Sequence, residues 1–126
     1  MRTTSNIRRF KLSEAFIEPY KTREVPWGPL GYVTFKRTYA RRLSEFETGA
    51  EGTEEWWQTC RRVIDAMFDM QKQHVYHLGL EWNDSKAQAT AKDAYDRLFN
   101  LKWTPPGRGL WMMGTKFVEE RTAAGL

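Results

Sequence analysis

The residues best suited to chemistry lie near the carboxyl end, where the chain reads Thr-Pro-Pro-Gly-Arg-Gly-Leu-Trp-Met-Met-Gly-Thr over residues 104–115. Two prolines end any helix that arrives from residues 98–102. The glycines on both sides of Arg108 allow the backbone to pass close to a large or phosphorylated group. A guanidinium in such a loop can pair with two phosphate oxygens at once. The segment therefore has the character of a phosphate-binding loop.

The apolar residues that follow, Leu110, Trp111, Met112 and Met113, predict a short buried strand. A lone strand leaves its backbone donors and acceptors unpaired. We therefore expect this segment to need a sheet supplied from elsewhere.

Positive charge is concentrated in the first third of the chain. Residues 1–42 hold ten Lys/Arg against three Asp/Glu, and residues 43–126 hold ten against thirteen, within a net charge of +4. The densest group comprises Lys36, Arg37, Tyr39, Arg41 and Arg42. Such a group can contact a nucleotide or a nucleic acid through phosphate oxygens. It can equally be a solvated face, or pair with acidic neighbours in the same chain.

No catalytic or metal-binding constellation can be assembled from the sequence. The serines lack a partnered histidine, and no Gly-x-x-x-x-Gly-Lys phosphate loop is present. His74 and His77 stand near a predicted helix end without the further ligands that a zinc site needs. The lone Cys60 falls in an apolar stripe, where a thiol is usually an inert small hydrophobe. We predict no catalytic and no metal-ligating residue in this chain.

Composition favours one small cytoplasmic domain. The chain has 126 residues, of which 40% are hydrophobic, enough for a modest core. It has no run of about 18 apolar residues, so no membrane span is predicted. No apolar stretch follows the basic amino terminus, so no secretory signal is predicted either. A single cysteine excludes an internal disulfide.

The clearest predicted helix begins with Thr53 as its cap and reaches about Tyr76. Glu54 and Glu55 fall in its first turn, where the helix dipole favours negative charge. Its apolar stripe has the three and four spacing of a buried helix face. The stripe comprises Trp56, Trp57, Cys60, Val63, Ile64, Met67, Phe68 and Gln71.

A second helix is expected from Asp84 or Ser85 to about Lys102. One side of it carries Ala87, Ala91, Ala94, Tyr95, Leu98 and Phe99. Because alanines permit close helix packing, we predict that the two helices form an antiparallel pair joined by residues 77–83.

The front of the chain is expected to be less regular. Residues 1–10 predict a loose basic arm, and a short helix capped by Ser13 should run until Pro19. Residues 26–31 form a rigid connection anchored by Trp27, and residues 44–52 a solvent-exposed loop. Residues 32–35 fit a strand or a helical face equally well, and periodicity does not decide between them.

Two long motifs give the sequence a family resemblance. Residues 27–41 read Trp-Gly-Pro-Leu-Gly-Tyr-Val-Thr-Phe-Lys-Arg-Thr-Tyr-Ala-Arg, and residues 104–111 are followed by Met113-Gly114-Thr115, with Glu54-Glu55-Trp56 in the helical spacer between them. In this order they resemble the start of the adenosylcobalamin-dependent ribonucleoside-triphosphate reductases, the monomeric class II ribonucleotide reductases. The likeness runs from about Trp27 to the end of the sequence.

The resemblance implies a mainly α fold, the amino-terminal helical region of a ten-stranded α/β barrel, ending in a lead-in to the first barrel strand. Residues 1–26 would be a basic arm and short helix, and residues 27–126 the reductase region. The resemblance also implies that Thr104, Gly107, Arg108 and Gly109 lie near the phosphates of a ribonucleoside triphosphate. The alternative is that the Gly/Pro cluster only makes the turn into the strand.

The resemblance further implies the cofactor and partners of a complete enzyme. Adenosylcobalamin would generate a thiyl radical, and a cysteine pair with a thioredoxin-like reductant would supply electrons. The family's Asn-Asn-Cys motif and its cobalamin site match no residue here. The chain alone is therefore expected to be inactive and to need the remaining reductase polypeptide. A split gene and an incomplete gene product fit equally well.

A competing hypothesis comes from the basic front of the chain. A small basic nucleic-acid-binding helical module would use these charges and the aromatic side chains. Steeply salt-dependent binding to DNA without any partner would support that hypothesis.

Overall fold

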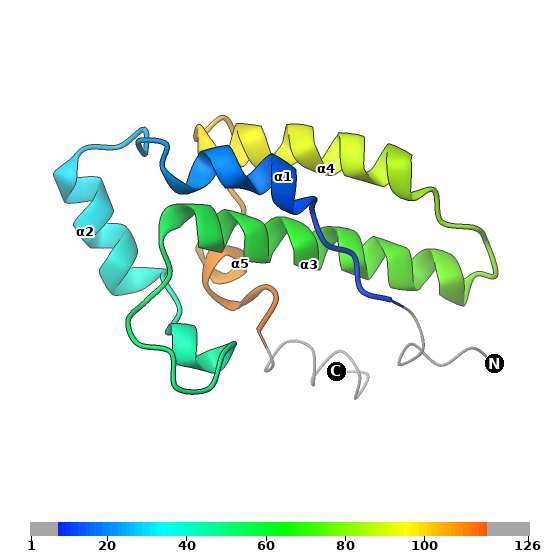
Figure 1. The fold of residues 1–126 in the computed structure, drawn as a ribbon, viewed down its shortest axis with the longest axis horizontal. Helices are drawn as coiled ribbons and strands as arrows, with labels where there is room; N and C mark the ends of the chain where they lie inside the picture. The colour runs from blue at the N-terminus through cyan, green and yellow to red at the C-terminus, as the bar shows by residue number, and fades with distance from the viewer. Residues whose placement is uncertain (1–7, 116–126) are drawn as a thin grey trace.

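Two long helices, α3 (Trp56–His77) and α4 (Asp84–Phe99), lie side by side and antiparallel in the computed structural model (Figure 1). The structure describes residues 8–115. Around the pair are α1 (Glu14–Ile17), the 3-10 helices η2 (Glu18–Lys21) and η3 (Leu43–Glu45), α2 (Pro29–Thr38) and α5 (Gly107–Met112). The predicted antiparallel pair is confirmed.

The amino-terminal end of α3 is fixed by a capping box. Glu55 is the N-cap residue, and its backbone N–H donates to the Gln58 side chain at 2.7 Å while its own side chain accepts from the helix. The prediction of Thr53 as cap is therefore wrong, because Thr53 instead accepts hydrogen bonds from Lys36. Most of the predicted stripe is buried, namely Trp56, Cys60, Val63, Ile64 and Phe68, whereas Gln71 is exposed.

The second helix begins where the sequence indicated and ends earlier. Asn83 caps α4 by accepting a hydrogen bond from the Lys86 N–H at 3.1 Å. The helix stops at Phe99, short of the predicted Lys102, because Leu101 adopts a left-handed conformation with φ 59°. Its buried face comprises Ala87, Ala91, Tyr95, Leu98 and Phe99, as predicted.

The segment from Phe10 to α1 packs on the helix pair, so the prediction of a loose arm over residues 1–10 is wrong at its end, while residues 1–7 lie outside the described part of the chain. Phe10 is 2% exposed and lies against the rings of Phe68 and Trp82. The backbone N–H groups of Phe10 and Leu12 donate to the Asp69 and Asp65 carboxylates, both at 2.9 Å. The sequence does not show this packing. The backbone of the segment is paired by the Asp65 and Asp69 side chains of α3, and not by a neighbouring strand, so no strand pattern marks it.

Residues 32–35, which periodicity left open, are helical. Pro29 occupies the first turn of α2, where its fixed φ suits a helix and its missing N–H costs nothing. Phe35 turns inward against Trp27 and Trp56. Gly31 permits this packing, since a Cβ there would lie 2.8 Å from the Trp27 Cβ. Trp27 thus anchors the connection, as expected, but the connection is shorter than the predicted residues 26–31 because α2 already begins at Pro29.

The prediction of a strand over Leu110–Met113 is wrong, because this run lies mostly in α5. Pro106 is extended and precedes the first turn, and its carbonyl accepts from the Leu110 N–H at 3.1 Å. The backbone groups are thus paired locally and need no neighbouring sheet. Leu110 is buried whereas Trp111 is 46% exposed, the pattern of a short helix with one face on the core.

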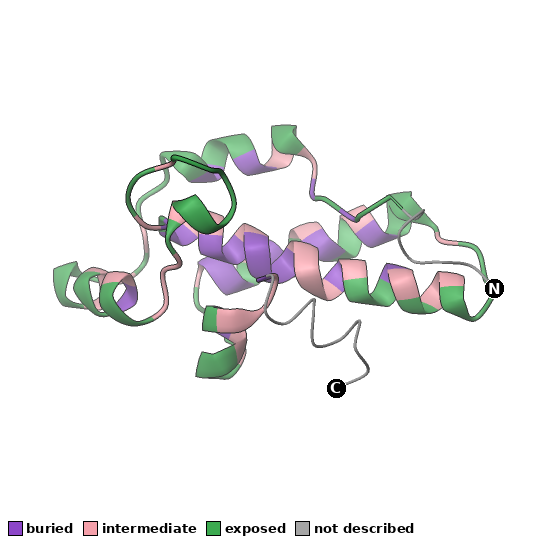
Figure 2. Cartoon of the chain, turned by 90° about the horizontal axis from the view of Figure 1, so that it is seen from below, coloured by how far each residue is buried: buried purple, intermediate pink, exposed green. Residues whose placement is uncertain are grey.

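Buried residues concentrate along α3 and on the sides of α1 and α4 that face it (Figure 2). No strand occurs within residues 8–115. None of the helices in this range is long and apolar enough to cross a bilayer.

Candidate functional site

The four predicted phosphate-binding residues lie at the start of α5 and just before it. Thr104, Gly107 and Arg108 are exposed and Gly109 is half-buried. The exposed Arg108 side chain makes no hydrogen bond or ion pair with other residues of the described range 8–115. A Cβ built on Gly107 would lie 3.4 Å from the Tyr39 ring, so the first turn of α5 passes close to the end of α2. The structure thereby brings Tyr39 of the basic group next to this segment.

Lys36, from the same basic group, is occupied within the chain. Its Nζ donates to the Thr53 and Glu54 carbonyls at 3.1 and 2.9 Å and to the Thr53 hydroxyl at 3.1 Å. It also forms an ion pair with Glu55 at 3.1 Å. Lys36 therefore ties α2 to the loop that leads into α3.

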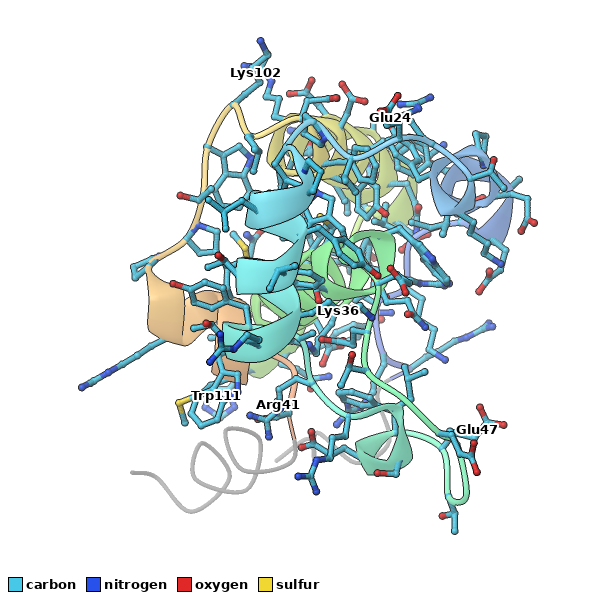
Figure 3. The ribbon with its side chains drawn as sticks, turned by 90° about the vertical axis from the view of Figure 1, so that its left-hand side faces the viewer. Glu24, Lys36, Arg41, Glu47, Lys102 and Trp111 are labelled. Atoms are coloured by element: carbon cyan, nitrogen blue, oxygen red, sulfur yellow. The ribbon has the colours of Figure 1, made fainter. Side chains whose placement is uncertain are left out.

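Arg41 is also paired internally, with its guanidinium bound to Glu45 at 2.5 Å and lying 4.7 Å from the centre of the Trp111 ring. Figure 3 shows Arg41 and Trp111 side by side. The hydrogen bond from Arg41 lowers the pKa of the Glu45 carboxyl. Arg37 and Arg42 are exposed, with no side-chain partner in the described part of the chain. The intramolecular alternative thus accounts for Lys36 and Arg41, and not for Arg37 and Arg42.

A buried ion pair behind α5 was missed by sequence reasoning. The Arg62 guanidinium binds both carboxylate oxygens of Glu54, at 3.0 and 3.1 Å. The two side chains are 6% and 3% exposed. Arg62 also donates to the carbonyls of Leu110 and Met113, at 2.6 and 2.5 Å. The sequence feature that could have revealed this pair is the position of Arg62 within the apolar half of an amphipathic helix, because a buried arginine requires a partner.

Glu54 holds further groups besides Arg62. Its Oε1 accepts from the Arg41 backbone N–H and from the Thr59 hydroxyl, both at 2.9 Å. One carboxylate therefore joins the loop after α2, the start of α3 and, through Arg62, the end of α5. The prediction that Glu54 and Glu55 lie in the first turn of α3 is therefore wrong, because α3 begins at Trp56, Glu55 is its N-cap residue and Glu54 precedes the cap.

A cavity of about 430 Å³ lies between residues 9–11, residues 43–47 and α3. Its charged lining is largely paired, since Arg61 binds Glu14 at 2.6 Å and Asp65 at 3.4 Å. The lining presents no free cluster of one charge sign.

Asp65 in this lining has a perturbed acidity. Burial raises the pKa of its carboxyl to about 6, although the Leu12 N–H and the Arg61 guanidinium both lower it. The unfolded carboxyl ionises near pH 4, so the native state binds the proton more tightly between pH 4 and 6. The contribution of Asp65 to the free energy of unfolding is therefore fully present below pH 4 and is lost as the pH rises through 6.

The substitution Asp65→Asn is expected to remove the decrease in the free energy of unfolding that Asp65 causes as the pH rises. Two pH units correspond to about 3 kcal/mol, so the free energy of unfolding of the variant, relative to the parent, should rise by up to about that amount between pH 4 and 7.5. The Asn oxygen can still accept from the Leu12 N–H. Urea unfolding at several pH values measures the difference, and Asp93→Asn at an exposed position of α4 controls for the substitution. A difference that does not change with pH would contradict the assignment.

Cys60 and the two histidines lie outside any site. Cys60 is fully buried in the stripe of α3, and burial raises the pKa of its thiol well above the usual value. His74 and His77 are exposed in the last turn of α3. Over residues 8–115 no group of His, Cys, Asp and Glu could hold a metal ion.

Comparison with known proteins identifies relatives of this arrangement. The family model described as "Ribonucleotide reductase alpha domain" matches residues 12–115. The chain is 38% identical over 117 residues to a probable adenosylcobalamin-dependent ribonucleoside-triphosphate reductase of Dictyostelium discoideum, and 37% identical over 116 residues to the reductase of that name from Euglena gracilis. These matches cover 91% and 90% of this chain and 15% of each relative.

A solved structure shows the same likeness. The crystal structure of a B-12 dependent (class II) ribonucleotide reductase superposes with a TM-score of 0.70 at 31% identity. The match covers 86% of this chain and 15% of that one. The chain thus spans about 15% of the length of the relatives that it matches.

Proposed function

This chain belongs to the ribonucleotide reductase alpha domain family, and from that premise we propose that it is the amino-terminal helical region of an adenosylcobalamin-dependent ribonucleoside-triphosphate reductase. The observation that carries the proposal is 38% identity extending over 91% of the chain. The proposed reaction is the reduction of a ribonucleoside triphosphate to its 2′-deoxy product, which supplies DNA synthesis. It would take place in the cytoplasm, where an unpaired thiol such as Cys60 stays reduced.

The cofactor does not fit the described residues. The cavity beside α3 measures about 430 Å³, the size of a pocket for a drug-sized ligand and too small for a corrin with its nucleotide, and most of the charged groups that line it are already paired. We therefore assign adenosylcobalamin, which would supply the radical, to the remaining polypeptide. A thioredoxin-like reductant would likewise act there. The lone thiol is buried in the core, so the isolated chain is expected to show no reductase activity.

The direct test uses the complete reductase that contains this chain. Conversion of a ribonucleoside triphosphate to its 2′-deoxy product should require both adenosylcobalamin and a dithiol reductant. Conversion that proceeds equally well without adenosylcobalamin would contradict the proposed enzyme class.

Within this enzyme we propose that Thr104, Gly107, Arg108 and Gly109 contact the substrate's phosphates. The supporting observations are that Arg108 is exposed, that it pairs with no residue in the described part of the chain, and that it lies in the first turn of α5. A guanidinium can bind phosphate through two parallel hydrogen bonds. Tyr39 lies against Gly107 and could assist, and so could Arg37 and Arg42, whereas Lys36 and Arg41 are paired internally.

Arg108→Ala in the complete reductase is expected to raise the KM for the triphosphate about tenfold, with kcat nearly unchanged. The reason is that a charge-assisted hydrogen bond made to both the bound substrate and the transition state affects binding alone. Steady-state kinetics measures both constants. Arg97→Ala, at an exposed position of α4, is the matched control. An unchanged KM for Arg108→Ala would remove the proposed role.

The nucleic-acid-binding hypothesis is not favoured. Two of its candidate cations, Lys36 and Arg41, hold the fold together through Thr53, Glu54 and Glu45. The relatives that match nearly the whole chain are reductases.

A further inference from the structure

The short helix α5 has little apolar anchoring of its own. It spans six residues, of which only Leu110 is buried. A helix of this length is not stable by itself, because each end leaves several backbone groups unpaired. Its position must therefore come from contacts with the rest of the fold.

Arg62 of α3 supplies the contacts at the carboxyl end of α5. Its two terminal nitrogens donate to the Leu110 carbonyl at 2.6 Å and to the Met113 carbonyl at 2.5 Å. These are groups that a helix end leaves without an internal partner, and a cation is favoured there by the helix dipole. The two carboxylate oxygens of Glu54 accept hydrogen bonds from the same guanidinium, Oε2 from Nε at 3.0 Å and Oε1 from Nη2 at 3.1 Å, and so fix its position.

The chain that leaves α5 also passes directly over Arg62. Gly114 has φ +79°, and a Cβ on it would lie 2.8 Å from Arg62 Cγ and 3.0 Å from the Arg62 carbonyl oxygen. Only a residue without a side chain fits so close to this backbone. Thr115 is buried next to it, and its hydroxyl donates to the Met112 carbonyl at 2.7 Å. Arg62 thus contacts both the last turn of α5 and the residue at which the chain turns away from that helix.

We propose that Arg62, held by Glu54, is a positioning residue for the substrate-phosphate segment: it fixes α5 on α3 and so determines where Arg108 is presented. This inference rests on the proposed function of Arg108. Arg62 is itself buried behind the helix and acts through α5. A lysine at position 62 would keep the charge near Glu54, but a single ammonium cannot reach the carboxylate and both carbonyls at once.

The test compares Arg62→Lys with Arg108→Ala in the complete reductase. In Arg62→Lys, hydrogen exchange over residues 107–115 should become about tenfold faster, while exchange within α4 stays unchanged. The KM for the triphosphate should rise about fivefold with kcat nearly constant, and the double variant should show no further rise beyond Arg108→Ala. Arg97→Lys, which alters an exposed ion pair on α4, should leave all of these values unchanged.

Gly114→Ala gives a second route if Arg62→Lys does not fold. It displaces the end of α5 without removing the Glu54–Arg62 pair, and it should raise the same exchange rates and the same KM. An unchanged KM in Arg108→Ala would overturn the phosphate contact and the positioning role together. A raised KM in Arg108→Ala with parental values in Arg62→Lys and Gly114→Ala would overturn the positioning role alone. Additive effects in the double variant would also overturn it.

Discussion

Glu54→Ala is expected to lower the free energy of unfolding by about 3–5 kcal/mol, because it leaves the Arg62 guanidinium buried without its counter-charge. The same substitution removes the acceptor of the Arg41 N–H and of the Thr59 hydroxyl. Both donors then lose their partner in a buried or partly buried setting. Urea unfolding followed by circular dichroism measures the loss.

Two further variants identify the cause of that loss. Glu51→Ala, in the exposed loop before α3, should change stability by less than about 0.5 kcal/mol. Glu54→Leu combined with Arg62→Met should recover part of the loss, since apolar side chains of similar size often replace a buried ion pair at little cost. If the double variant is less stable than Glu54→Ala, the unpaired charge is not the cause.

The helix pair α3–α4 could be predicted because its signals are local. The apolar stripe of α3 recurs every three or four residues, and the alanines of α4 share one face, so burial follows from spacing alone. The family resemblance is equally a property of the sequence, and the matches to reductases confirm it. The mainly helical fold is confirmed for residues 8–115.

The state of α5 could not be predicted from its own residues. Four consecutive apolar residues fit a strand or a buried helical turn. In the structure the run is helical, and the Leu110 carbonyl accepts a hydrogen bond from Arg62, which lies 48 residues earlier in the chain. A contact of this separation leaves no periodic signal near Leu110.

The basic group was ambiguous for a related reason. Charge spacing in Lys36, Arg41 and Arg42 is the same whether a side chain faces solvent, a ligand or an acidic neighbour. The partners of Lys36 are the carbonyls of Thr53 and Glu54, and backbone groups cannot be recognised as partners from residue types. Only the fold separates Lys36 and Arg41 from Arg37 and Arg42.

Trp56→Ala is expected to cost about 3–5 kcal/mol of folding free energy, the usual range for removing a buried tryptophan. Trp56 is 2% exposed, and its ring lies 4.5 Å from that of Trp27 and 5.4 Å from that of Phe35. Its indole N–H donates to the Phe99 carbonyl at 3.0 Å, which joins the start of α3 to the end of α4. The same side chain therefore holds α2 and α4 on α3.

The separate contributions of the ring and the N–H can be measured with Trp56→Phe. This variant keeps most of the apolar contact with Trp27 but leaves the Phe99 carbonyl unpaired, and should cost about 1–3 kcal/mol. Trp111→Ala, which removes a half-exposed ring, should cost less than about 1 kcal/mol. If Trp56→Ala and Trp111→Ala had similar midpoints in urea, α2 would not depend on Trp56. In that case the Lys36 contacts to Thr53 and Glu54 would be what holds α2 in place.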